Sequence, residues 1–157
     1  MTQIKYLIKL LLLTDFRIKM YIKFITNKNN DVILLKKFCS KQLRKKYCII
    51  IKHNTIIGNN LIMPHPQNII IGLYCRIGNN CTIYQDVTIG QNKNKYPTIG
   101  NNVIIYAGAK IIGDVHVGDN AIIGANAVVT KDIPLNAIVG GIPAKVIKYR
   151  SNDDEFY

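Results

Sequence analysis

Aliphatic residues recur every six positions over most of this chain, in three runs that begin at Ile51, Ile71 and Ile99. A small or β-branched residue often follows four positions later, as at Cys75 and Ala109. A fixed six-residue period is typical of a parallel β-helix, because one hexad is too short to bury its own apolar side chain without stacked neighbours. The pattern predicts an inward column formed by Ile51, Ile57, Met63, Ile71, Ile77, Ile83, Ile89, Ile99, Ile105, Ile111, Val117, Ile123, Val129 and Leu135.

Glycine and asparagine recur at fixed places in the hexads, as at Gly78 with Asn80 and at Gly100 with Asn102. We expect the glycines to occupy tight corners, where a Cβ would restrict φ. Asparagine tolerates left-handed backbone conformations and suits the same corners. The i, i+3, i+4, i+7 spacing of an amphipathic helix is absent, which argues against a helix in this region.

Residues 63–72, 85–90 and 140–145 carry a resemblance to a known family. Through them, residues 51–149 resemble the hexapeptide-repeat acyltransferases, and the serine acetyltransferase-like branch in particular. The resemblance implies a left-handed coil of three hexads, an exception to the right-handed crossover rule. We therefore predict an all-β fold, a left-handed parallel β-helix (a hexapeptide-repeat solenoid) with a short N-terminal helical segment. The expected divisions are a helical and basic segment at 1–48, the β-helix acyltransferase domain at 49–140 and a C-terminal extension at 141–157.

The first 48 residues differ in kind from the repeats. The apolar run at 6–13 is short, is interrupted by lysine and lacks a small-residue cleavage site, which argues against a spanning helix or a signal peptide. We interpret the segment as amphipathic helices that cap the first coil, as solenoids require. The alternative is attachment to an anionic membrane surface through the basic residues Lys36, Lys37, Lys41, Arg44, Lys45 and Lys46.

The net charge and the cysteines limit the binding partners and the cellular location that can be expected. The formal net charge of +12 favours a polyanionic neighbour, such as coenzyme A phosphates, acidic glycans or lipid headgroups. Nucleic acid is not expected, because no binding motif accompanies the charge. Cys75 and Cys81 fall on inward positions, so burial as small hydrophobic residues is favoured over metal binding or a disulfide. Reduced thiols and the lack of a cleavable signal favour a cytoplasmic protein, at the inner face of the membrane if the basic segment attaches there.

Two insertions interrupt the six-residue period, with two extra residues between Met63 and Ile71 and four between Ile89 and Ile99. Insertions in repeat proteins form surface loops, often on the binding face. The resemblance implies a homotrimer in which a histidine and an inserted loop form the active site between neighbouring subunits. His65 lies where these enzymes carry their catalytic histidine.

Register arithmetic places other residues near this histidine. Counting hexads and insertions puts His65, Gln85, Ala107 and Ala125 in one outward column, with a step of about 4.8 Å per coil and a length of roughly 14 Å. This length suits the pantetheine arm of acetyl-coenzyme A (acetyl-CoA), with the thioester at His65. Together with the phosphate contacts that the resemblance implies, the expected cosubstrate-binding residues are Ala107, Gly108, Ala125, Lys131 and Lys145.

A histidine is a suitable general base for acetyl transfer to a hydroxyl, because it can take the proton of the attacking alcohol and return it to the departing thiolate. Backbone N–H groups would stabilise the oxyanion, and the resemblance implies direct transfer without an acyl-enzyme. Gln85, Asp86 or a backbone carbonyl could orient His65, and Lys95 and Tyr96 are expected to contact the acceptor. No metal is expected, because the three histidines fall at different hexad positions. His53 and His116 are interpreted as structural or exposed.

Three departures from the serine acetyltransferases decide the expected acceptor. Pro64 stands where these enzymes carry an Asp, Lys95-Tyr96 replaces an Arg-His pair, and Ile50 replaces an Asp fifteen residues before the histidine. A serine amine and carboxylate would lose matching charges. The sequence therefore favours a sugar hydroxyl of a surface polysaccharide (capsule or O-antigen) or its precursor. Tyr96 would stack on the sugar ring or, alternatively, pack the loop. The other hypotheses are a serine O-acetyltransferase and a catalytically idle scaffold or γ-carbonic-anhydrase-like metal protein.

Overall fold

The computed structural model describes residues 14–26, 33–52 and 54–151, in which two helices precede a long series of short strands. Helix α2 spans Thr14–Thr26 and helix α3 spans Ile33–Tyr47. The strands are β1 (Ile50–Ile51), β2 (Ile56–Ile57), β3 (Ile70–Ile71), β4 (Arg76–Ile77), β5 (Thr82–Ile83), β6 (Thr88–Gly90), β7 (Thr98–Ile99), β8 (Ile104–Ile105), β9 (Lys110–Ile112), β10 (His116–Val117), β11 (Ile122–Ile123), β12 (Val128–Val129), β13 (Ala137–Gly140) and β14 (Lys145–Tyr149).

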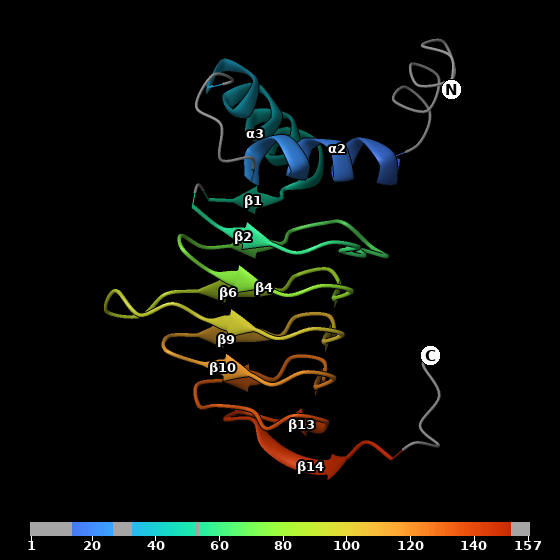
Figure 1. Cartoon of the computed structure of the whole chain (residues 1–157), viewed down its shortest axis with the longest axis vertical. Coiled ribbons are helices and arrows are strands. Elements are labelled where there is room, and N and C mark those ends of the chain that lie inside the picture. The colour runs from blue at the N-terminus through green and yellow to red at the C-terminus, as the bar shows by residue number, and fades with distance from the viewer. Residues whose placement is uncertain (1–13, 27–32, 53, 152–157) are drawn as a thin grey trace.

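Three β-sheets form the sides of the solenoid. Sheet A has the strand order β1-β3-β6-β9-β12, sheet B β10-β7-β4-β2 and sheet C β14-β13-β11-β8-β5. Neighbouring strands are parallel except β13 and β14, which are antiparallel. In Figure 1 the chain crosses the front from left to right, returns behind and descends, which is a left-handed turn. The predicted parallel β-helix is confirmed, with about 4 turns.

In-register pairing converts the six-residue period into a continuous core. Ile71 lies opposite Ile89, and Ile89 lies opposite Ile111, and none of the three is exposed. The residues four positions later, such as Cys75 and Ala109, are equally buried. Each buried aliphatic side chain contributes about 1.5–3 kcal/mol relative to an exposed one. The stacked columns therefore provide the apolar interior that no single hexad could form.

Asparagines form a ladder along the corner between sheets B and C. The side-chain amide of Asn60 donates to Asn80 Oδ1 over 3.0 Å, and Asn80 donates to Asn102 over 3.2 Å. Asn102 donates to Asn120 and Asn120 donates to Asn136. All five have φ between 54° and 60°, in the left-handed region. The expected role of asparagine at the corners is confirmed.

The glycines that follow the aliphatic residues serve a different purpose from the expected one. Gly78 and Gly100 are not among the residues with positive φ. A Cβ on Gly78 would instead lie 2.4 Å from the carbonyl oxygen of Gly100 in the next coil. The expectation of a φ requirement is wrong at these positions, because the limiting factor is the close approach of neighbouring coils.

The predicted inward column fails at its last member. Leu135 is 62% exposed, whereas Ile133 is 5% exposed and pairs with Val117. The corner after Val129 is two residues shorter than a regular hexad, so the inward position comes four residues after Val129. Val139, six residues later, is again fully buried. A deletion near the C-terminal end thus shifted the period, which a count of fixed hexads could not detect.

Both ends of the solenoid are covered. Helices α2 and α3 lie over the first coil (Figure 1), and Leu43 of α3 is buried and accepts a hydrogen bond from the Ile49 N–H over 3.2 Å. At the opposite end β14 pairs with β13, although its own side chains are exposed. The apolar run at 6–13 lies outside the described residues. No helix in the described part is long and apolar enough to cross a bilayer.

The inward cysteines are buried free thiols, as predicted. Cys75 and Cys81 have no exposed surface, and burial raises the pKa of the Cys75 thiol to about 11. Cys81 donates to the Gly100 carbonyl oxygen over 3.2 Å. Both thiols are therefore protonated at neutral pH and fill the interior as small apolar groups.

Candidate active site

The first insertion forms the corner that presents His65. This corner joins the isolated bridge at Ile62, in line with sheet C, to β3 in sheet A. The His65 carbonyl accepts the Gln67 N–H over 2.8 Å, and Asn68, in the left-handed region at φ 52°, donates its N–H to the Tyr47 carbonyl at the end of α3. His65 itself is exposed. The two extra residues thus place the His65 imidazole on the outside of the solenoid, at a corner held by hydrogen bonds.

The hydrogen bonds between coils keep Gln85, Ala107 and Ala125 in one outward column, but His65 is not its first member. The Asp86 N–H donates to the Gln67 carbonyl, so Gln67 stands opposite Gln85 and His65 lies in the two-residue insertion before it. Further along, the Gly108 N–H donates to the Gln85 carbonyl over 3.0 Å, and the Asn126 N–H donates to the Ala107 carbonyl over 2.9 Å. Ala107 is partly buried and Ala125 is exposed. Beyond Gln85, therefore, the outward position itself is occupied by alanine in both following coils.

Gln85 has an unusual side chain within this column. Its Oε1 atom is buried and has no hydrogen-bond partner in the described part of the chain. A buried acceptor without a donor is costly. The atom therefore marks a position where a donor from a ligand or a neighbouring subunit would be stabilising.

Tyrosines line the column, and sequence reasoning missed them. The Tyr84 and Tyr106 rings stack with centroids 5.1 Å apart at an interplanar angle of 22°, and the His65 ring lies 6.1 Å from the Tyr84 ring at 51°. The signal was available, because the two tyrosines hold equivalent positions in successive coils once the four-residue insertion is counted. The register arithmetic had been applied only to the position of His65.

Asp86 stands beside the His65 corner, with φ 61°. Its Oδ1 accepts a hydrogen bond from the Asn68 side chain over 2.7 Å, and its N–H donates to the Gln67 carbonyl over 3.1 Å. The Lys110 ammonium donates to the backbone carbonyl of Asp86. The exposed carboxylate is thus held at the corner that carries His65.

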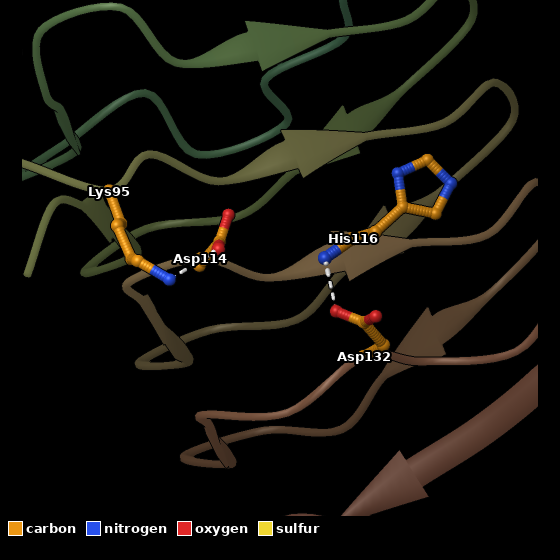
Figure 2. A network of polar contacts seen from close by, with 4 residues as sticks. All are labelled: Lys95, Asp114, His116 and Asp132. Atoms are coloured by element: carbon orange, nitrogen blue, oxygen red, sulfur yellow. Dashed lines mark hydrogen bonds and ion pairs between the residues drawn. The ribbon is translucent and has the colours of Figure 1, made fainter.

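The second insertion, residues 91–97, is a hairpin loop that projects from the solenoid and is drawn in yellow in Figure 1. Asn92 and Lys95 exchange backbone hydrogen bonds of 3.1 and 3.0 Å. The Lys95 ammonium pairs with Asp114 over 3.0 Å, with both side chains about two-thirds exposed (Figure 2). The Tyr96 ring meets the Tyr74 ring edge-on at 5.1 Å. This contact corresponds to the alternative in which Tyr96 packs the loop against the coil.

Arg76 is a third residue that the sequence reasoning missed. It lies on β4 and lines the same shallow pocket as Lys95, Tyr96 and Asp114. Its side chain is exposed. The fold therefore places a guanidinium beside the ammonium of the inserted loop, although the two residues are far apart in sequence.

The two insertions occupy different corners of one subunit. His65 lies at the corner from sheet C to sheet A, whereas residues 91–97 join β6 of sheet A to β7 of sheet B. One chain therefore does not bring His65 together with Lys95 and Tyr96.

The two lysines that were predicted to contact the phosphates lie at different corners of the solenoid. Lys145 begins β14, directly after the turn at 140–144, whose Ala144 N–H donates to the Val128 carbonyl of the coil that carries Ala125. Lys131 is exposed at the corner that follows β12 in sheet A. Lys145 therefore lies near the end of the outward column, and Lys131 lies at a neighbouring corner.

The remaining histidines stand apart from this site. His116 is exposed on β10, and its backbone N–H donates to Asp132 over 2.8 Å while its ring points away from that carboxylate (Figure 2). His53 lies outside the described residues. Among the residues that the structure describes, no group of three or more His, Cys, Asp or Glu side chains could hold a metal ion.

Comparisons with known proteins point to one group of enzymes. Residues 96–131 match the family described as bacterial transferase hexapeptide (six repeats). The chain is 44% identical over 96 residues to the serine acetyltransferase of Staphylococcus xylosus, covering 59% of this chain and 44% of that protein. For the Synechococcus elongatus serine acetyltransferase the identity is 41% over 99 residues, covering 60% and 40%. The chain thus spans less than half the length of these relatives.

Solved structures of serine acetyltransferases are also similar to this chain. The serine acetyltransferase of Neisseria gonorrhoeae superposes with a TM-score of 0.78 at 26% identity, over 97% of this chain and 62% of that chain. A serine acetyltransferase in complex with CoA superposes with a TM-score of 0.72 at 29% identity, over 84% of this chain and 56% of that one.

These findings overturn the predicted polysaccharide acceptor, because the relatives and the structural neighbours are serine acetyltransferases. The prediction equated the loss of charges at three sequence positions with the loss of charges from the site. The fold places the Arg76 guanidinium in the same pocket as the Lys95 ammonium and holds the Asp86 carboxylate at the His65 corner, so charged groups remain around both insertions. The six-residue period, the solenoid and these similarities are consistent with a hexapeptide-repeat acyltransferase of the serine acetyltransferase-like branch.

Proposed function

We propose that this protein is an acetyl-CoA-dependent O-acetyltransferase whose acceptor is the hydroxyl of L-serine. The observation that carries the proposal is the similarity to serine acetyltransferases at 41–44% identity. It is supported by an exposed histidine on an inserted corner, next to a column that carries only alanine beyond Gln85.

In this reaction His65 is the general base. The imidazole takes the hydroxyl proton as the serine oxygen attacks the thioester carbonyl, and it returns that proton to the coenzyme A thiolate as the carbon–sulfur bond breaks. Acetyl passes directly from sulfur to oxygen, with no covalent enzyme intermediate.

Acetyl-CoA would lie along the outward column. Ala107 and Ala125 leave room for the pantetheine arm, and their amide N–H groups donate to no protein acceptor in the described part of the chain. Gly108 contributes the adjacent backbone. Lys145 would meet the phosphates at the end of the column, with Lys131 approaching from a neighbouring corner. The column length of roughly 14 Å matches most of a pantetheine arm.

Charged groups around the two insertions suit an amino acid. The Asp86 carboxylate, fixed beside the His65 corner, would bind the serine ammonium. Arg76 and Lys95 would bind the serine carboxylate, since a guanidinium suits the two oxygens of a carboxylate. The exposed Lys95–Asp114 pair is worth about 0–1 kcal/mol, so a substrate carboxylate can replace Asp114 at small cost.

A homotrimer would complete the site. Because His65 and the loop at 91–97 occupy different corners of one subunit, a neighbouring subunit would supply the loop. A ring of three subunits with a repeated head-to-tail interface provides three equal sites.

The test is turnover with purified protein, acetyl-CoA and L-serine, followed as thiol release. We expect saturable turnover with L-serine, together with O-acetyl-L-serine as the product. Thiol release no faster with serine than without an acceptor would contradict the proposal.

We also propose that the helical end contacts an anionic membrane surface from the cytoplasmic side. A groove between α3 and β1 is lined by Lys36, Lys37, Lys41, Arg44 and Lys52 and by no acidic residue. Leu34 and Phe38 are exposed on the same helix, at 84% and 52%. Exposed apolar side chains beside cations are typical of interfacial helices.

Co-sedimentation with phosphatidylglycerol vesicles tests this location. Lys41→Glu should weaken binding about fivefold or more, since each cation near such a surface is worth about 1 kcal/mol. The matched control is Lys93→Glu, an exposed lysine in the loop at 91–97 away from the helical end. Equal binding to phosphatidylcholine vesicles, or equal losses in the two variants, would contradict the proposal.

A further inference from the structure

A general base must hold its imidazole in one orientation, and the described structure shows no polar group that does so for His65. Ile50, fifteen residues before the histidine, is an aliphatic residue of β1 paired with Ile70. The Asp86 Oδ1 atom accepts from Asn68, and Gln85 Oε1 has no partner in the described residues. The His65 ring lies beside the Tyr84 ring, with the ring centroids 6.1 Å apart and the ring planes at 51°. Aromatic pairs interact over centroid separations of about 4.5–7 Å.

Tyr84 is itself held in place. Its ring stacks on Tyr106 at 5.1 Å and 22°, and both side chains are partly buried. The Tyr84 N–H donates to Ile105 over 3.0 Å, and the Tyr106 N–H donates to Ile123 over 2.9 Å. The two rings thus stand on hydrogen-bonded rungs of adjacent coils and form a fixed surface next to the histidine.

We propose that Tyr84, supported by Tyr106, is the positioning residue of His65 and performs by ring contact the orienting role that a carboxylate would otherwise perform. The inference rests on the proposed function for its kinetic consequence, although the ring contact exists without substrate. Tyr84 exchanges no proton with the substrate. It restricts rotation of the imidazole, so that the nitrogen facing the acceptor hydroxyl stays aligned.

This role predicts that removal of the ring lowers kcat but leaves KM nearly unchanged. Tyr84→Leu removes the ring and should lower kcat about two- to tenfold, the range that corresponds to the loss of one aromatic pair. The KM values for acetyl-CoA and serine should change little. Tyr84→Phe keeps the ring and should retain near wild-type kcat. Tyr106→Leu, one step removed, should give a smaller loss. Tyr149→Leu on the exposed strand β14 is the matched control and should behave as wild type.

A second measurement does not depend on turnover. The ¹³C order parameter of the His65 ring, measured by NMR without substrate, should fall in Tyr84→Leu and stay at the wild-type value in Tyr84→Phe and Tyr149→Leu. An unchanged order parameter in Tyr84→Leu would overturn the proposal, as would a Tyr84→Phe variant as slow as Tyr84→Leu. Wild-type protein that fails to acetylate serine would contradict the proposed function alone, since the ring measurement would still decide the role of Tyr84.

Discussion

At the residue scale, the candidate site combines residues that the sequence singles out, among them His65, with a guanidinium, that of Arg76, which it does not. His65 could be singled out from the sequence because an insertion and a motif coincide there, although Gln67 and not His65 takes the register position opposite Gln85. Arg76 could not be singled out, since its meeting with Lys95 depends on how β4 and the loop at 91–97 come together in space. Tyr84 and Tyr106 were not predicted but could have been, because the same register arithmetic places them at equivalent positions of adjacent coils.

The first residue-scale prediction concerns the base. His65→Ala should lower kcat by about two to four orders of magnitude, because it removes the group that accepts the hydroxyl proton. Coenzyme A binding, measured by calorimetry, should remain nearly unchanged, since the column beyond Gln85 is intact. A variant with wild-type turnover would show that another group is the base.

The second residue-scale prediction concerns the serine carboxylate. Arg76→Gln should raise the KM for serine about tenfold, as expected for one charge-assisted hydrogen bond of about 1.5 kcal/mol, and should leave the KM for acetyl-CoA unchanged. Arg44→Gln, on helix α3, is the matched control and should have wild-type constants. Equal constants for Arg76→Gln and wild type would remove Arg76 from the acceptor site.

At the element scale, the six-residue period determines the walls and the core of the solenoid but not the length of each corner. The period ran correctly from Ile71 to Val129 and then failed, because the following corner is two residues shorter and Ile133 takes the inward place expected for Leu135. The sequence also located the glycines without revealing their purpose. Only the packing of adjacent coils shows that Gly78 has no room for a side chain.

This packing gives the element-scale prediction. Gly78→Ala should destabilise the protein by about 1–3 kcal/mol, because a Cβ 2.4 Å from the Gly100 carbonyl forces two coils apart. Gly90→Ala is the matched control, since the nearest atom to its Cβ would be a side-chain carbon at 3.7 Å. Thermal unfolding should show a clearly lower Tm for Gly78→Ala only. Equal melting temperatures would contradict the close-approach explanation.

At the scale of the whole molecule, the central claim is that one acetyl-transfer site is built from two subunits. The sequence shows two insertions, and counting along the chain cannot say whether they meet. The topology separates them, with His65 at the corner between sheets C and A and the loop at the corner between sheets A and B. A second copy of the chain is the simplest way to bring the loop to His65.

The most direct test mixes two inactive chains. One carries His65→Ala and the other has residues 92–96 replaced by two glycines, and trimers that contain both are isolated with two different tags. Whatever its composition, every such trimer has one interface of three with an intact histidine and an intact loop, so turnover of L-serine should recover to about a third of the wild-type value. Mixed trimers as inactive as the two parent proteins would contradict the shared site.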